Sequence, residues 1–239
     1  MEIHRPKPVH SLREFLSEIV VIVVGILIAL ALEQLVEALH WWGRVNEAKT
    51  AIHKELVLTT VFAEERIAWH ACADAYLANL EAAVAASPPQ WQPTSNTFCG
   101  SSHKTVYADK FRTWPTEVWR SIEAEGVVSH FEGHYRRSAP FTFSYIGDTN
   151  VLNTAEYHDA SNLGPLAYPI ILTPDAKIGF LKALDSLRQQ NDGLMLSSTQ
   201  LLQLIAELGE TPTEAELKEM RATVPLLYRN QSADAPKQQ

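Results

Sequence analysis

One apolar run near the amino terminus constrains this chain more than any other feature. Ile19 to Leu32 is fourteen residues long without a polar side chain, and its flanks extend it to a mostly apolar segment of twenty-two residues, Phe15 to Val36. A helix rises about 1.5 Å per residue, so this segment reaches roughly 33 Å and spans a hydrocarbon core of about 30 Å. The sequence therefore predicts a transmembrane anchor over residues 15–42, with Trp41 and Trp42 at a membrane interface, where amphipathic rings prefer to lie.

Two other interpretations of this run stay open. Fourteen apolar residues also fit the core of a cleaved signal peptide or the buried helix of a soluble protein. Ala29-Leu30-Ala31 looks like a signal-peptidase site, but Ile28 to Leu39 continue in good helix formers across it. We expect a retained signal anchor.

The orientation of the anchor rests on a short basic tail. Three basic residues precede the apolar segment and three follow it closely, so the flanking charges are almost balanced. Short basic tails ahead of a single anchor usually stay in the cytoplasm. We expect residues 1–14 to form a cytoplasmic tail, the anchor to lie in a bacterial inner membrane, and the bulk of the chain to be periplasmic.

One stripe along the predicted anchor carries small and acidic residues that a helix facing only lipid does not need. Gly25 and Ala29 form a small-xxx-small pair that lets two helices approach closely, and Glu18 and Glu33 bracket them. An ionised carboxylate facing lipid costs roughly 2.5–3.5 kcal/mol near the bilayer centre. Either the stripe packs against another transmembrane helix, or both glutamates lie at the headgroups and Gly25 is incidental. The stripe consists of Glu18, Ile22, Gly25, Ala29, Glu33, Val36 and His40.

The composition excludes one class of partner. The net charge is −8 and there is no long basic run, whereas nucleic-acid binding needs clustered Lys and Arg. We therefore expect the lipid bilayer and other transmembrane helices as partners, and no nucleic acid. The remaining length allows an outer domain of up to about 195 residues, or two smaller ones.

The chain has two cysteines, Cys72 and Cys99. In an oxidising compartment they would form a disulfide, whose closed loop a chain-entropy argument values at roughly 3–4 kcal/mol. The alternative is a pair of free thiols buried in the core. Two cysteines with this spacing do not make a metal motif.

The helix of the anchor is expected to continue outward. Apolar residues follow at helical spacing up to Val84, and the first prolines after the anchor are Pro88 and Pro89. We predict a long amphipathic helix over residues 43–87, with one face against a partner surface and one in solvent. The charged residues expected on the solvated face are Lys49, Lys54, Glu55, Glu64, Glu65, Arg66 and Glu81.

The rest of the chain is predicted to be a loop over residues 88–108, a helical bundle domain over 109–228 and a disordered tail over 229–239. Strand alternation does not persist anywhere, so the predicted class is all-α. The start and stop signals are Thr113 to Glu117 for a helix ending at Gly126, Ser129 with Glu132 as a capping box, a helix from Phe141 to about His158, Thr173-Pro174 for a helix that bends or is interrupted at Gly193, and Thr211-Pro212-Thr213-Glu214 as a further capping box.

Histidines offer one candidate for chemistry. His130 and His134 are four residues apart, a spacing that can place two imidazoles on one helix face for a metal, with His158 as a third ligand. The segment lacks the glutamate that a metalloprotease helix has after its first histidine, and Gly133 weakens the helix. The alternative is histidines at the surface or the edge of the core.

Aromatic residues offer another candidate. Trp114, Trp119 and Tyr135 could line a pocket for a small ligand, or they could anchor the domain core. Phosphate-binding glycine loops and G-x-S-x-G sequences do not occur in the chain. We predict neither a cofactor nor a catalytic residue.

Two segments resemble a family of bacterial single-pass inner-membrane proteins without an assigned reaction. Ser17 to Leu32 is similar to that family's amino-terminal anchor, with a glutamate before an apolar run and a Gly-Ile-Leu-Ile-Ala-Leu core, here Gly25 to Leu30. Thr116 to Gly126 is similar to a helix of that family in which glycine follows tryptophan by seven residues. The resemblance implies one anchor and an α-helical outer domain, and it implies no reaction or cofactor.

The leading hypothesis is a non-enzymatic, membrane-anchored assembly protein or an accessory subunit of a larger membrane complex. It would contact itself or its partners through the anchor stripe and the periplasmic helices. A periplasmic domain that senses a small ligand near the two tryptophans is the first alternative. An enzyme with a histidine metal site is the second.

Overall fold

The chain is described by a computed structural model that covers residues 12–93, 97–99, 101–102, 106–107 and 111–223. It divides into two compact units, Met1–Ala48 and Lys49–Gln239. The predicted all-α class is confirmed, because helices dominate both units. The helices are α1 (Leu12–Ala86), α2 (Glu117–Ala124), α3 (Gly133–Asn162), α4 (Pro174–Leu208) and α5 (Glu214–Thr223), with short 3₁₀ helices η1 (Val127–His130) and η2 (Gly164–Ala167).

Helix α1 contains the apolar run and continues without a break into the second unit, as the sequence predicts. It ends at Ala86, directly before Ser87-Pro88-Pro89, because proline lacks the amide that a further helical turn would use. Among the described helices, α1 is the one that is long and apolar enough to cross a membrane. In the first unit, every described side chain from Leu12 to His40 is exposed.

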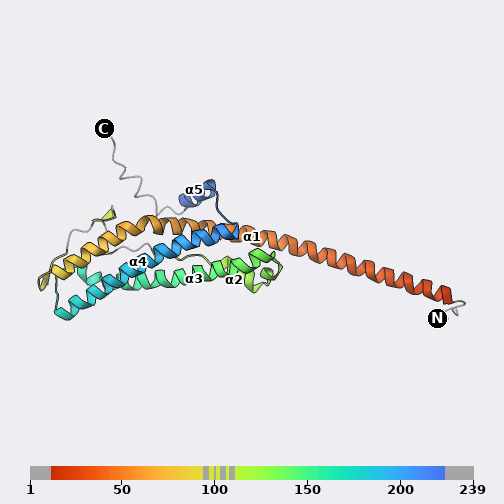
Figure 1. Cartoon of the computed structure of the whole chain (residues 1–239), viewed down its shortest axis with the longest axis horizontal. Coiled ribbons are helices and arrows are strands. Elements are labelled where there is room, and N and C mark those ends of the chain that lie inside the picture. The colour runs from red at the N-terminus through yellow and green to blue at the C-terminus, as the bar shows by residue number, and fades with distance from the viewer. Residues whose placement is uncertain (1–11, 94–96, 100, 103–105, 108–110, 224–239) are drawn as a thin grey trace, which may run out of the picture. The chain divides into compact units, whose positions relative to one another are not determined.

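Three long helices form the bundle of the second unit, and side-chain contacts fix their directions. Lys49 of α1 bonds Glu132 at the start of α3, and Arg66 bonds Glu156 near its end, so α3 runs parallel to α1. At the start of α4, Lys177 Nζ donates to the carbonyl oxygen of Ala85, so α4 runs antiparallel to both. Figure 1 shows this part of α1 beside α3 and α4.

Because α1 and α3 are parallel, the chain between them returns along the bundle, and we call residues 87–116 the return segment. Trp91 is buried near the end of α1, and its Nε1 donates to the carbonyl oxygen of Leu166 at 2.8 Å. Trp114, also buried, packs edge-on against Phe62 of α1. The segment contains β1 (Gln90–Trp91), β2 (Thr97–Phe98) and β3 (Ser101–Ser102); β1 pairs antiparallel with β4 (Ile170–Ile171), and β2 with β3.

One apolar core fills the end of the bundle where α1 stops. Its members come from α1, the return segment, the connection between α3 and α4 that includes η2, and α4, so it joins segments more than a hundred residues apart in sequence. The buried residues are Ala73, Leu77, Leu80, Val84, Trp91, Val106, Tyr107, Leu163, Leu166, Leu172, Leu184 and Leu187.

The predicted start of α4 agrees with the structure, and α5 starts two residues later than its predicted capping box, Thr211 to Glu214. Thr173 is the N-cap of α4, and its hydroxyl accepts the amide of Ala176 at 3.2 Å. Thr213 and Glu216 form a reciprocal capping box at the start of α5, with Thr213 N donating to Glu216 Oε2 at 2.8 Å and Glu216 N to Thr213 Oγ1 at 3.3 Å. The predicted disordered tail, 229–239, lies outside the described residues.

The start of α3 differs from its prediction. The helix begins at Gly133 instead of Phe141 and contains Pro140, which costs it one internal hydrogen bond. Tyr135 and Ala139 are both buried, so packing of the first two turns against the bundle outweighs that loss. The capping box predicted for Ser129 and Glu132 is wrong, because the Ser129 hydroxyl donates to the Gly126 carbonyl within η1.

Helix α4 continues through Gly193, so of the two predicted alternatives, a bend and an interruption, the interruption does not occur. A Cβ atom at this position would lie 2.9 Å from Leu152 Cδ2, so glycine allows α4 to approach α3 closely. The solvated face predicted for α1 is also partly wrong: Glu55, Glu65 and Arg66 are buried. The reason is that other parts of the second unit cover these residues: Glu55 meets α2, Arg66 meets α3 and Glu65 meets the return segment.

Candidate functional site

The predicted anchor stripe is an open surface. Ile22 is 61% exposed and Val36 is 67% exposed, and a Cβ built at Gly25 meets no atom within 4 Å. Glu18, Ala29, Glu33 and His40 are exposed as well. Described side chains elsewhere in the chain therefore leave this stripe uncovered, and it is accessible to lipid or to another helix.

The two tryptophans at the end of the predicted anchor differ in their surroundings. Trp42 is 68% exposed. The Trp41 ring lies 6.0 Å from the ring of His40, and the Arg44 guanidinium lies 5.5 Å from its centre. Aromatic rings next to a cation fit the boundary between an apolar phase and water.

A buried ion pair links α1 to α3. Arg66 Nη1 and Nη2 donate to Glu156 Oε1 and Oε2 at 3.0 and 2.5 Å, and both side chains are almost fully buried. Asn153 Oδ1 accepts a further bond from Arg66 at 3.2 Å, and Tyr107 OH donates to Glu156 Oε1 at 3.0 Å. The bidentate geometry and these neutral partners compensate for the desolvation of both charges.

The return segment joins this network through Arg112. Its carbonyl oxygen accepts a bond from Asn153 Nδ2 at 3.0 Å, and its Nε lies 3.6 Å from Glu65 Oε2. Its guanidinium also lies over the ring of Phe62, at 5.9 Å from the centre. The charged groups of the interior thus hold three parts of the chain together.

Glu55 caps a helix that is distant in sequence. Its Oε1 and Oε2 accept the amides of Val118 and Trp119, at 3.1 and 3.2 Å, in the first turn of α2. The N-cap of α2, Thr116, makes no capping bond with its side chain. Burial raises the pKa of Glu55, and the two amide bonds oppose this rise.

His53 lies between two carboxylates. Its Nδ1 is 2.7 Å from Glu210 Oε2, just beyond α4, and its Nε2 is 3.0 Å from Glu216 Oε1 of α5. Burial lowers the pKa of His53, but the bonds to the two carboxylates raise it more, so the net shift is upward. The pKa of Glu216 falls to about 2, mainly because Thr213 donates two hydrogen bonds to it.

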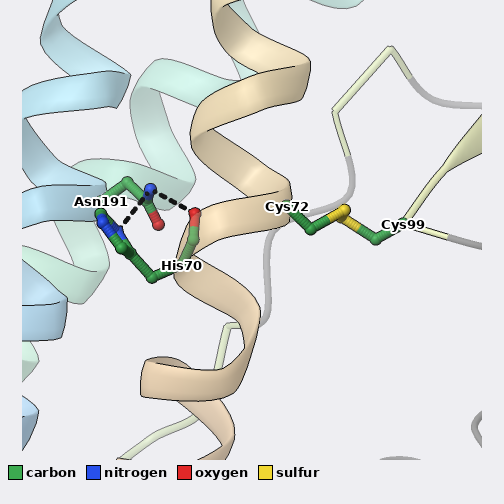
Figure 2. The surroundings of a disulfide bond; sticks show 4 residues. All are labelled: His70, Cys72, Cys99 and Asn191. Atoms are coloured by element: carbon green, nitrogen blue, oxygen red, sulfur yellow. Dashed lines mark hydrogen bonds between the residues drawn. A yellow bond between two sulfur atoms is a disulfide. The ribbon is translucent and has the colours of Figure 1, made fainter.

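Figure 2 shows the disulfide on one side of α1 and the hydrogen bonds between His70 and Asn191 on another side. Cys72 of α1 is bonded to Cys99 of the return segment, with their Cα atoms 5.8 Å apart, so the expected disulfide is present. On the other side, Asn191 Nδ2 of α4 lies 3.0 Å from His70 Nδ1 and donates to the His70 carbonyl oxygen at 3.1 Å.

The aromatic residues proposed for a ligand pocket lie in the core instead. Trp114, Trp119 and Tyr135 are each at most 5% exposed. Trp119 stacks on Phe143 of α3 with ring centres 4.8 Å apart, which fills the space that a ligand would need. These three aromatic residues therefore anchor the domain core, which was the alternative to a ligand pocket.

The three histidines proposed for a metal are not brought together. His130 ends η1 and His134 lies in the first turn of α3, with an extended Phe131 between them. His134 Nε2 donates to the carbonyl oxygen of Glu207, and His158 is a further 24 residues along α3, about 36 Å by the helical rise. Across the described ranges, His, Cys, Asp and Glu do not form a group of three placed to hold a metal.

The interior charges are the feature that sequence reasoning missed. One signal for them was present: Leu56 to Ala63 is an eight-residue stretch of α1 without a charged side chain. A helix that is apolar on all sides is buried on all sides, so charged residues next to this stretch should have been expected inside.

Comparison with protein-family models, with curated proteins and with solved structures finds no match.

Proposed function

We propose that this protein is a non-enzymatic, single-pass membrane protein of the bacterial inner membrane, and that it assembles with itself or as an accessory subunit of a larger complex. One observation carries the proposal: the apolar segment of α1 is long enough to cross a bilayer and none of its most apolar window is buried. The core helix of a soluble protein would be mostly covered. Lipid is the environment that covers such a surface.

Two features support a retained anchor with the second unit in the periplasm. Helix α1 runs without a break through Ala29-Leu30-Ala31, where a signal peptide would be cut, and on into the bundle. The two cysteines of the chain are bonded to each other. Disulfides form and persist in oxidising compartments, and the periplasm is one.

The open stripe around Gly25 and Ala29 supports assembly within the membrane. Small residues let helix backbones approach closely, and two carboxylates on the same side favour a polar partner over lipid. The partner in this proposal is another transmembrane helix, from a second copy of the chain or from another membrane protein.

The bundle supports a structural role for the second unit. Its buried charges bind one another or backbone amides, as in the pair of Arg66 and Glu156 and the cap that Glu55 provides to α2. Such contacts hold the helices in register, and they occupy the hydrogen-bonding atoms of these charged side chains. The second unit in this proposal is a rigid domain that presents its helices to partners.

Fractionation of cells that express the full chain at its native level tests the anchor and its orientation. After alkaline carbonate extraction, we expect the protein in the membrane pellet. Protease added to cells with a permeabilised outer membrane should digest the second unit under reducing conditions. Release of the full-length protein by carbonate, or protection of the second unit from protease, would contradict the proposal.

A further inference from the structure

The carboxyl-terminal helix α5 is held on the bundle by few contacts. It has ten residues, and Leu217 is the one that is buried. Isolated helices of this length are marginal in water, so α5 depends on its contacts with the bundle. Arg221 Nη2 donates to Glu64 Oε2 of α1 at 2.5 Å, and Glu216 meets His53 of α1 at 3.0 Å.

The two contacts place α5 along one face of α1. His53 and Glu64 are three turns apart, and by helical spacing Val57, Thr60 and Val61 lie on the face between them. These three residues are buried.

The position of His53 between two carboxylates favours a second proton on its ring. A neutral imidazole has one donor and one acceptor nitrogen, so it can donate to one carboxylate only. Here both ring nitrogens lie within hydrogen-bond distance of a carboxylate oxygen, one from Glu210 and one from Glu216. Only the imidazolium donates to both, and its deprotonation would leave one of the two carboxylates facing the lone pair of a ring nitrogen.

The two carboxylates are fixed by different parts of the chain. Glu210 follows Gly209, which has φ of 83° and ends α4. The amide of Glu210 donates to the Ile205 carbonyl oxygen, so Glu210 is held by the end of α4 and belongs to the bundle. Glu216 uses Oε2 for the capping box with Thr213 and Oε1 for His53. The imidazolium therefore connects the first turn of α5 to the end of α4 and to α1.

We propose that His53, held between Glu210 and Glu216, is a proton-dependent latch that docks α5 on α1 in mildly acidic conditions and releases it in alkaline conditions. The latch is independent of the proposed function, because it lies within the second unit.

Other charged and titratable groups lie on the elements around His53. Lys49, one turn earlier in α1, pairs with Glu132 of α3 at 2.7 Å and lies 4.8 Å from the centre of the Tyr135 ring. The pKa of Tyr135 is raised, first by its burial and then by the charge of Glu210, so it stays neutral. On α5, Glu214 pairs with Arg221 at 3.0 Å, and Glu207 of α4 meets His134 through its carbonyl oxygen.

The direction of the pH dependence follows from these shifts. The pKa of His53 is raised when α5 is docked, so the stabilisation is complete below about 6.5 and is lost as the pH rises through the higher, docked value. Glu216, with a pKa of about 2, stays ionised throughout this range. The docking constant should fall about tenfold for each unit by which the docked pKa exceeds that of a free histidine.

Hydrogen exchange followed by mass spectrometry on the full chain in detergent tests the latch. Protection factors of residues 214–223, corrected for the intrinsic pH dependence of exchange, are compared at pH 6 and pH 9. We expect at least a severalfold loss of protection in the wild type. The His53→Lys variant keeps a positive charge and should retain protection at pH 9, whereas His53→Gln should already be weakly protected at pH 6.

The matched control is His158→Gln, which alters an exposed histidine of α3 and should behave as the wild type does. Protection of residues 135–160 reports whether each variant keeps the bundle. A wild-type helix α5 equally protected at both pH values would overturn the proposal. So would a full pH dependence in His53→Gln with the bundle intact.

Discussion

The buried pair of Arg66 and Glu156 shows what individual residues contribute to the second unit. Both side chains are at most 3% exposed, so neither charge has water to replace a lost partner. We predict that Glu156→Gln lowers the free energy of unfolding by about 3–5 kcal/mol, because it leaves a buried guanidinium without its counter-charge. Urea unfolding of the full chain in detergent, followed by tryptophan fluorescence, measures this loss.

The matched control for this prediction is an ion pair at the surface. Arg188 donates to Asp74 and to Glu81, but its side chain is 38% exposed. Asp74→Asn should cost at most about 1 kcal/mol, because water and salt screen such pairs. Equal losses for Glu156→Gln and Asp74→Asn would show that the buried pair has no special role.

Glu55 provides a test of capping between distant segments. Gln at this position keeps an acceptor for the amides of α2 and avoids a buried charge, whereas Ala removes both acceptors. We predict that Glu55→Ala lowers the free energy of unfolding by about 1–2 kcal/mol more than Glu55→Gln does. Chemical unfolding of the two variants decides this, and a larger loss in Glu55→Gln would contradict the capping role.

At the scale of elements, the return segment depends on its covalent link to α1. Cys72 and Cys99 are 27 residues apart in sequence, and closing a loop of this length stabilises a chain by roughly 3–4 kcal/mol in the chain-entropy model. We predict that the double variant Cys72→Ser/Cys99→Ser has a free energy of unfolding in urea lower by this amount than that of the oxidised wild type. Reductant should destabilise the wild type and leave the double variant unchanged; a loss below about 1 kcal/mol would contradict the prediction.

Local signals predicted the elements that depend on a few neighbouring residues. Pro88 and Pro89 marked the end of α1, and Thr173-Pro174 marked the start of α4. The start of α3 was missed, because Pro140 is a local signal against helix and the packing that overrides it is not local. Helix boundaries are thus readable where no tertiary contact competes with the sequence.

The interior of the bundle could not be predicted in the same way. Arg66 and Glu156 are 90 residues apart, and their pairing depends on α3 running parallel to α1 through the return segment. Glu55 looks like a residue of a solvated face unless the position of α2 is known. Amphipathic spacing assumes one covered side, and α1 is covered on several.

At the scale of the whole molecule, the anchor stripe distinguishes assembly through the membrane from simple anchoring. Ala29 lies on the stripe, and Ala31 lies about 200° away on the same helix. We predict that Ala29→Leu weakens the complex in the membrane, because the larger side chain separates two closely packed helices. Ala31→Leu is the matched control and should leave the complex intact. Equal behaviour of the two variants would exclude the stripe as the contact.

Assembly in the membrane is tested most directly by the mass and composition of the species that a mild detergent releases from native membranes. We predict a defined complex larger than one chain of 26.7 kDa after subtraction of detergent, containing several copies of the chain or other subunits in fixed ratio. A single chain in detergent, or full-length protein in the soluble fraction before any detergent is added, would contradict it.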